Sequence, residues 1–142
     1  MTNFAFIIHL LATAMMVGVI WIVQIVHYPA FEFVEEKKFR DFALFHQQKI
    51  TYIVGPIMLI EFMTGLYLLP QLNLIFSASM VLLVGIWLVT FFFSVKEHNT
   101  LLSGRDEQSI KRLIKSNWLR TLLWSTRLVI LTFLFLVNLN FV

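Results

Sequence analysis

The sequence predicts an all-α integral membrane protein, a four-helix bundle that forms a single transmembrane domain over residues 1–142. Hydrophobic residues make up 59% of the chain and charged residues 13%, whereas about a quarter of the residues in an ordinary soluble domain are charged. The apolar residues also gather into stretches long enough to cross a bilayer. The chain has no cysteine, which excludes a disulfide framework and any cysteine-based metal site.

The apolar stretches predict four membrane spans joined by polar segments. An uncharged turn at residues 69–73 joins the second and third spans into an antiparallel hairpin. The predicted spans run from Phe4 to Val26, Tyr52 to Leu69, Leu72 to Val95 and Trp118 to Leu139.

Amphipathic segments precede the second and fourth spans. Residues 31–50 place apolar side chains at helical spacing and fit either a helix on the membrane surface or an extension of the second span. Ser103 and Asp106 have the spacing of a capping box, which predicts that a helix begins there. Because its apolar stripe runs on past Asn117, we expect the fourth span to be one part of a long helix.

The basic residues predict the orientation in the membrane. Every lysine, and every arginine outside the fourth span, lies between the first and second or the third and fourth spans. The positive-inside rule then places both of these segments in the cytoplasm and both termini outside, in the cell's inner (cytoplasmic) membrane. The formal net charge of +3 is therefore a topology signal, and no nucleic-acid-binding motif is present. We expect the lipid bilayer and a small hydrophobic ligand as partners, and a homo-oligomer stays open.

Each span carries its polar residues at spacings of three and four, so that four polar stripes can converge inside the bundle. At about 1.5 Å per residue, Glu61 and Arg127 both lie about 14–15 Å from the cytoplasmic boundary. We expect them to form a pair. Ionisable residues inside a membrane are functional by default, although a buried ion pair that only fixes helix register is the alternative.

Three histidines, His27, His46 and His98, fall at one depth near the cytoplasmic boundary. Imidazoles with a nearby carboxylate suit iron, zinc or copper, so these residues are candidate metal ligands. The alternative is that each is an interfacial hydrogen-bonding group. A heme is disfavoured, because His9 has no second histidine at equal depth on another helix.

The segment "EHNTLLSGRDEQSIKRLIKSNWLRT" resembles the region before the last helix in the anthrone-oxygenase-like family of four-span membrane proteins. The resemblance rests on an N-x-x-L segment followed by Asn117, Trp118 and the pair Arg120-Thr121. It implies oxidation of a polycyclic phenolic carbon without a metal or organic cofactor. The chain also resembles small four-span bacterial membrane proteins that bring no activity with them. More faintly, its first span resembles heme proteins of the membrane protoporphyrinogen-oxidase type.

These observations lead to a membrane-embedded oxidoreductase or oxygenase-like enzyme with a cytoplasm-facing pocket for a hydrophobic aromatic or anionic substrate. Arg120 and Arg127 would stabilise an oxyanion, and Glu61 or a histidine would move the proton. The alternatives are a non-enzymatic ligand- or metal-binding protein, a small oligomeric transporter subunit, or an assembly factor. Candidate ligand-binding residues are Gln24, Tyr28, Asn117, Trp118, Thr121 and Trp124.

Overall fold

The computed structural model describes residues 2–71 and 73–139, and the described residues are helical apart from short loops, with no strand among them. Two segments, η1 and η4, are π-helical, and η2 and η3 are 3₁₀-helical. In chain order the elements are α1 (Thr2–Ile22), η1 (Val23–His27), α2 (Tyr28–Ala30), η2 (Phe31–Phe33), α3 (Glu36–Leu68), η3 (Leu69–Gln71), α4 (Leu74–Val89), η4 (Thr90–Val95), α5 (Lys96–Leu101) and α6 (Glu107–Leu139).

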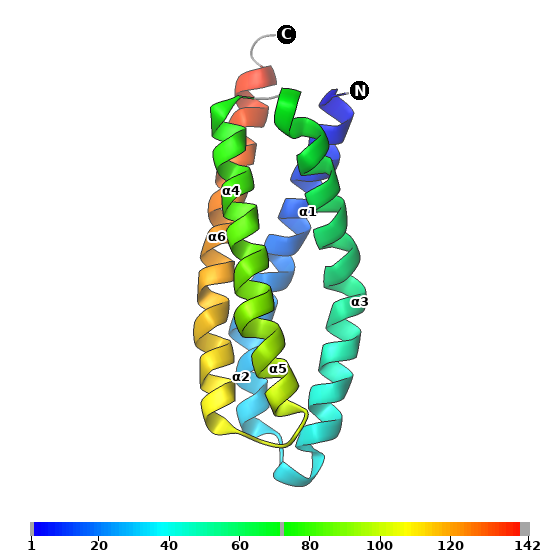
Figure 1. Ribbon diagram of the computed structural model, residues 1–142, viewed down its shortest axis with the longest axis vertical. Helices are drawn as coiled ribbons and strands as arrows, with labels where there is room; N and C mark the ends of the chain where they lie inside the picture. The colour runs from blue at the N-terminus through cyan, green and yellow to red at the C-terminus, as the bar shows by residue number, and fades with distance from the viewer. Residues whose placement is uncertain (1, 72, 140–142) are drawn as a thin grey trace.

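The long helices run side by side as an elongated bundle (Figure 1). α1 packs against both α3 and α6, and α4 packs along α6. α1 begins and α6 ends at the same end of the bundle as η3, whereas α2 and α5 lie at the opposite end (Figure 1). α3 therefore has its main helix contact with α1 and not with α4, its neighbour in sequence.

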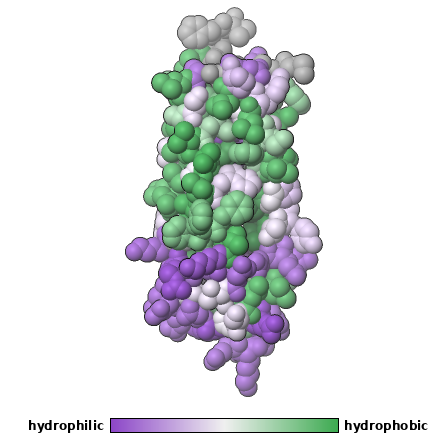
Figure 2. All heavy atoms as spheres, viewed as in Figure 1, coloured by the Kyte–Doolittle hydropathy of each residue, from purple (hydrophilic) through white to green (hydrophobic). Residues whose placement is uncertain are grey.

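Four helical segments are long and apolar enough to cross a membrane, which confirms the predicted spans at the level of length and composition. Figure 2 shows apolar side chains over the middle of the visible face and strongly hydrophilic ones gathered at the end that carries α2 and α5, here called the charged end. Large apolar side chains point outward from the middle, among them Phe92 (68% exposed) and Val129 (70% exposed). An apolar surface of this extent suits contact with lipid. The four segments are Asn3–Phe33, Glu36–Gln71, Leu74–Leu101 and Glu107–Val137.

The structure decides how the amphipathic segments continue. α3 begins at Glu36 and runs without a break to Leu68, so most of the 31–50 segment is an extension of the second span. α6 is likewise one helix of 33 residues, which confirms the long helix expected from the sequence.

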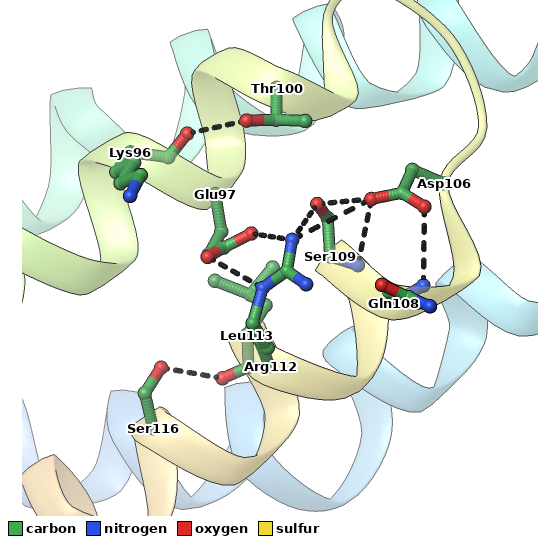
Figure 3. A network of polar contacts seen from close by, with 9 residues as sticks. All are labelled: Lys96, Glu97, Thr100, Asp106, Gln108, Ser109, Arg112, Leu113 and Ser116. Carbon is green, nitrogen blue, oxygen red and sulfur yellow. Dashed lines mark hydrogen bonds and ion pairs between the residues drawn. The ribbon is translucent and has the colours of Figure 1, made fainter.

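The start predicted for the last helix at Ser103 is wrong by one turn. Asp106 is the cap, and its carboxylate accepts hydrogen bonds from the backbone N–H groups of Gln108 (3.3 Å) and Ser109 (3.0 Å; Figure 3). Ser103 instead belongs to the turn after α5. In that turn Gly104 has φ 145°, a conformation that other residues rarely adopt. Because the chain turns at Gly104, α6 begins at Glu107 and not near Ser103.

Polar contacts hold the charged end together. Arg112 of α6 donates two hydrogen bonds to Glu97 of α5, from Nε to Oε1 (2.9 Å) and from Nη2 to Oε2 (3.1 Å; Figure 3). Arg105 donates to the backbone carbonyls of Val34 (2.7 Å) and Glu32 (3.1 Å). These contacts tie the loop before α3 to the loop before α6.

Apolar side chains fill the bundle in three clusters, one at the charged end, one in the middle and one near the termini. α3 also approaches its neighbours closely at Gly65, where a Cβ atom would lie 2.5 Å from Sδ of Met80 and 3.0 Å from Cε1 of His9. The largest buried members of the clusters are Phe31, Phe39, Leu101 and Ile110 at the charged end, Met16, Ile20, Ile86 and Trp124 in the middle, and Phe76, Leu68 and Leu83 near the termini.

Candidate functional site

The buried ion pair predicted from the sequence is present. Arg127 of α6 donates from Nη1 to Oε1 of Glu61 on α3, and both side chains are 0% exposed. Their positions confirm that the two residues lie at matched depth and that both point into the bundle. We call this pair and the side chains bonded to it the inner network.

Side chains from all four long helices complete the inner network. Glu61 accepts further hydrogen bonds from Oγ1 of Thr13 (2.6 Å) and Nε1 of Trp124 (3.2 Å). Arg127 donates from Nε to the carbonyl and hydroxyl oxygens of Ser79, at 3.0 and 3.3 Å, and from Nη2 to His9 (3.1 Å). Each of these side chains is buried at 0% exposure.

The hydrogen bonds also determine the tautomer of His9. A guanidinium can only donate, so Nε2 of His9 must be the acceptor and Nδ1 carries the proton. Nδ1 then donates to Oγ1 of Thr64 (3.0 Å), and the Thr64 hydroxyl donates its own hydrogen bond to the carbonyl of Ile60 (2.7 Å). No buried nitrogen or oxygen in these described side chains lacks a partner. The inner network is therefore closed, because each of its polar side-chain atoms has at least one hydrogen-bond partner.

The second arginine, Arg120, has a different environment. It is 6% exposed, and Nη1 donates to Oγ of Ser94 (3.2 Å) and Oδ1 of Asn117 (3.1 Å). The guanidinium also lies over the ring of Trp124, 5.4 Å from its centroid, and interacts with the Tyr28 hydroxyl. Among the described residues no carboxylate pairs with Arg120, and its Nε is buried without a hydrogen-bond partner. Arg120 is thus a buried cation whose bonding capacity is only partly used.

Polar residues behind Arg120 hold it in place. Asn117 donates from Nδ2 to Oε1 of Gln24 (2.9 Å), and Gln24 donates to the carbonyl of Ile114 (3.4 Å). Thr121 donates to the carbonyl of Asn117 (3.0 Å). Asn117 therefore holds the arginine in place and is itself held by Gln24, and none of the predicted ligand-binding residues Gln24, Asn117 and Thr121 lines the cavity in front of Arg120.

A cavity of about 270 Å³ lies in front of Arg120, between α1, α3 and the α4–η4 segment. Most of its wall is apolar, and the few polar groups gather toward Arg120 and the charged end. Its lining residues include Val23, Val54, Met58, Trp87 and Phe91 on the apolar side, and Tyr28, Gln47, Thr51, Thr90, Ser94, His98 and Arg120 on the polar side.

Both π-helical segments lie at the level of this cavity. η1 supplies Val23 to its wall and Gln24 to the polar residues behind it, and η4 supplies Thr90 and Ser94. Single π-helical turns inside longer helices occur frequently at functional sites. Their presence in two helices at one depth marks this level of the bundle as the candidate site.

The histidines predicted as metal ligands do come together, but as a stack of rings. The rings of His27 and His46 lie 4.2 Å apart and 30° from parallel, and those of His46 and His98 lie 5.2 Å apart and 32° from parallel. Nitrogens in the planes of stacked rings do not converge on one point. Among residues 2–71 and 73–139 no group of three or more His, Asp or Glu side chains could hold a metal ion. The three-histidine site expected from the sequence therefore does not fit the arrangement found.

One histidine takes part in the cavity wall. The Tyr28 hydroxyl lies 3.1 Å from Nε2 of His98, and both residues line the cavity beside Arg120. His27 and His46 instead leave their Nε2 atoms buried without a hydrogen-bond partner. A tyrosine–histidine pair next to a guanidinium is suited to moving a proton.

Two predicted tryptophans lie away from the cavity. Trp118 is 43% exposed on the outside of the bundle. Its ring lies nearly perpendicular to that of Trp21, with 5.8 Å between the ring centroids. Trp124 is fully buried in the inner network and not in the cavity lining. Ser79, Ser94 and Trp87 were not among the predicted site residues. The two serines could have been found as polar residues inside an apolar span, and Trp87 precedes Thr90 and Ser94 at spacings of three and four, which places it on the same helical face.

No family model matches the chain, and neither the curated proteins nor the solved structures include one with significant similarity to it. The resemblances drawn from the sequence therefore stay predictions. The function has to be inferred from the geometry of the site.

Proposed function

We propose that the protein is a multi-pass protein of the cytoplasmic (inner) membrane that binds a small hydrophobic molecule, with its aromatic or anionic head against Arg120. The observation that carries this proposal is a buried guanidinium without a carboxylate partner at one wall of a mostly apolar cavity.

The physical argument concerns the unpaired charge. Removing a guanidinium from water is unfavourable unless hydrogen bonds and an opposite charge compensate it. Arg127 has both kinds of compensation within the protein, whereas Arg120 has two hydrogen bonds from Nη1 and no described carboxylate. A ligand that brings an anionic or hydrogen-bond-accepting head would supply what is missing. An apolar cavity with a few convergent polar groups is the usual form of a small-molecule site.

The orientation belongs to the same proposal. Lysines and arginines are concentrated at the charged end, where Lys38, Arg40 and Lys111 are exposed. The positive-inside rule places this end in the cytoplasm, and the cavity then lies in the cytoplasmic half of the bilayer.

A second candidate function is an enzyme that acts on the bound head group, as an oxidoreductase or oxygenase-like protein would. The Tyr28–His98 pair favours it, because these two residues could transfer a proton while Arg120 stabilises negative charge on the substrate. Glu61 and Arg127 do not line the cavity, and in both candidate functions we assign them to the stability of the bundle.

The ligand carried by the protein provides the test. We would purify the wild type and Arg120→Gln in mild detergent, extract bound hydrophobic molecules and identify them by mass spectrometry. The expected result is a molecule with an anionic or acceptor head whose yield falls at least about tenfold in Arg120→Gln, as loss of a charge-assisted hydrogen bond predicts. Arg40→Gln, at an exposed arginine, is the matched control. Equal yields from all three proteins would overturn the proposal.

Tyr28→Phe distinguishes a binding protein from an enzyme, because the variant keeps the aromatic ring and lacks the hydroxyl group that could transfer a proton. Binding alone predicts that the same molecule is recovered in one chemical form from the wild type and from Tyr28→Phe. An enzyme predicts that a converted form accompanies it in the wild type and is missing from the variant.

A further inference from the structure

Along the bundle axis, contacts between side chains of neighbouring helices form a partial closure at each end of the cavity beside Arg120. Toward the charged end, Gln47 of α3 donates a hydrogen bond to Asn99 of α5 at 3.3 Å. Toward the termini, the ring of Phe62 on α3 meets the ring of Trp87 on α4, with 5.7 Å between centroids. A ligand that entered along the axis past these contacts would have to displace one of them.

The exposed part of the cavity wall faces sideways. Thr51 and Gly55 of α3 line the cavity and are exposed, and so are Phe91 and Val95 of η4. These four residues lie on the two helices that flank the gap between the closures, and we call this gap the side opening. In a protein that spans the membrane with its apolar middle, this opening faces lipid.

The protein itself shows how one of its arginines binds a carboxylate. Arg112 uses the edge formed by Nε and Nη2, which donate to the two oxygens of Glu97 at 2.9 and 3.1 Å. In Arg120 the Nη1 atom is occupied by Ser94 and Asn117, whereas Nε has no partner. Nε of Arg120 is buried and unpaired, so a planar, two-oxygen acceptor would pair with this edge once the side chain turns to bring it into the cavity.

We infer that the ligand is a lipophilic carboxylic acid that enters from the bilayer through the side opening. Its carboxylate binds the Nε edge of Arg120 and its chain leaves between α3 and η4. This inference rests on the proposed function and adds the chemical class of the ligand and its route. A cavity of about 270 Å³ is small for a whole lipid, so only the head and the first part of the chain fit inside, and the rest extends into the membrane.

The test uses the full-length protein in phosphatidylcholine nanodiscs, a dibrominated stearic acid as the probe, and its methyl ester as the uncharged analogue. Bromine quenches tryptophan fluorescence at short range, and Trp87 lies in the cavity wall. Trp21 and Trp118 are exposed and give a background that rises steadily with probe. The part of the quenching that saturates and disappears in Trp87→Phe therefore reports binding in the cavity.

Two glycines provide a matched pair of variants for the route. A Cβ atom at Gly55 or at Gly18 would meet nothing within 4 Å, so both positions tolerate a larger residue. Gly55 lies at the side opening and Gly18 does not line the cavity. We expect Gly55→Leu to weaken saturable quenching by the acid at least about tenfold by filling the opening, and Gly18→Leu to leave it unchanged.

The head group is tested at Arg120. We expect Arg120→Gln to abolish the saturable quenching and the methyl ester to show none in the wild type. If Arg120→Gln does not fold, Arg120→Lys replaces it, because lysine keeps the positive charge but lacks the pair of N–H donors along one edge. We expect Arg120→Lys to bind the acid about tenfold more weakly than the wild type.

Each outcome has one meaning. Equal binding of the acid by Gly55→Leu and Gly18→Leu would overturn the proposed route through the side opening. Equal binding of the acid and the methyl ester would overturn the proposal that the ligand carries a carboxylate. In either case, binding that still depends on Arg120 would leave the proposed function standing. No saturable quenching by the acid would overturn this inference alone if the purified protein still carries another Arg120-dependent molecule. If the extracted molecules are also independent of Arg120, both proposals fail.

Discussion

Arg120 and Arg127 lie seven residues apart on α6, but their positive charges are compensated to different degrees. Arg127 faces Glu61 and donates to His9 and Ser79, so that each of its three nitrogens and both carboxylate oxygens have a hydrogen-bond partner. Arg120 is almost equally buried and has no such partner among the described residues. A closed pair stabilises a unique helix register, whereas a partly unused cation provides a place for a ligand. This difference is the reason why we propose a binding role for Arg120 and a structural role for Arg127.

The closed pair leads to a stability prediction. Replacing Glu61 with Gln leaves Arg127 as a buried, unpaired charge, which should lower the free energy of unfolding by about 3–5 kcal/mol. Arg127→Gln should have an effect of similar size, and the double variant should lose less than the sum of the two. The measurement is unfolding in detergent, followed by helical circular dichroism.

Glu35→Gln is the control, because its ion pair with Lys38 is long (3.9 Å) and lies at the surface. Exposed pairs of this kind contribute little to stability. Single Glu61 and Arg127 variants as stable as Glu35→Gln would contradict a stabilising role for the inner network.

At the scale of the elements, the start of α6 depends on one carboxylate. Asp106 accepts hydrogen bonds from the first turn of the helix, and the Ser109 hydroxyl donates to it as well (Figure 3). That side-chain hydrogen bond is the main reason why the pKa of Asp106 lies below its ordinary value, with the backbone hydrogen bonds and Arg112 acting in the same direction. The ionised form is therefore favoured by folding.

The sign of the pH dependence follows. Because the folded pKa is lowered, the stabilisation is fully present above the unfolded Asp pKa of about 3.9 and is lost as the pH falls through the folded value. Asp106→Asn still caps the helix but does not titrate. We expect the stability advantage of the wild type over Asp106→Asn to shrink as the pH is lowered from about 6 to about 3. Thermal unfolding of both proteins across this range is the measurement, and a difference that does not change with pH would contradict the role of the charge.

The elements also show where sequence periodicity stops being informative. The spacing from His46 to Glu61 passes through Ile53 or Val54 equally well, because both are apolar. The structure exposes Ile53 (52%) and places Val54 at the cavity. A stripe of residues spaced by three and four shifts gradually around the surface of a straight helix. Where only apolar residues lie between two polar ones, the sequence does not show which of the apolar residues belong to the stripe.

At the scale of the whole molecule, the distribution of charge predicts the topology. The chain has no cysteine, so a single introduced cysteine can be labelled without background. We expect Pro70→Cys, in the turn between α3 and α4, to react with a membrane-impermeant maleimide on intact cells. Lys111→Cys, at the charged end, should react only after the membrane is permeabilised. Labelling with the opposite pattern would reverse the proposed orientation.

The sequence predicted more of the architecture than of the site. Length and hydropathy were enough for the four long helices, and matched depth was enough to pair Glu61 with Arg127. The same reasoning grouped Arg120 with that pair in one pocket, whereas the structure separates them into a closed network and an open cavity. Depth along a helix can be read from residue spacing. Which helices meet at a given depth, and whether rings such as His27 and His46 stack or converge, depends on packing that spacing does not encode.

The inner network also bears on the order in which the protein is made. Glu61 and Arg127 are 66 residues apart, so α3 leaves the ribosome well before α6 exists. Of the partners described for the Glu61 carboxylate, Thr13 alone comes from the part of the chain synthesised earlier; Trp124 and Arg127 both arrive with the last helix. Insertion of α6 is therefore the step that completes the bundle. In the proposed membrane protein, a nascent chain that stalled before this step would carry the Glu61 carboxylate without its arginine partner.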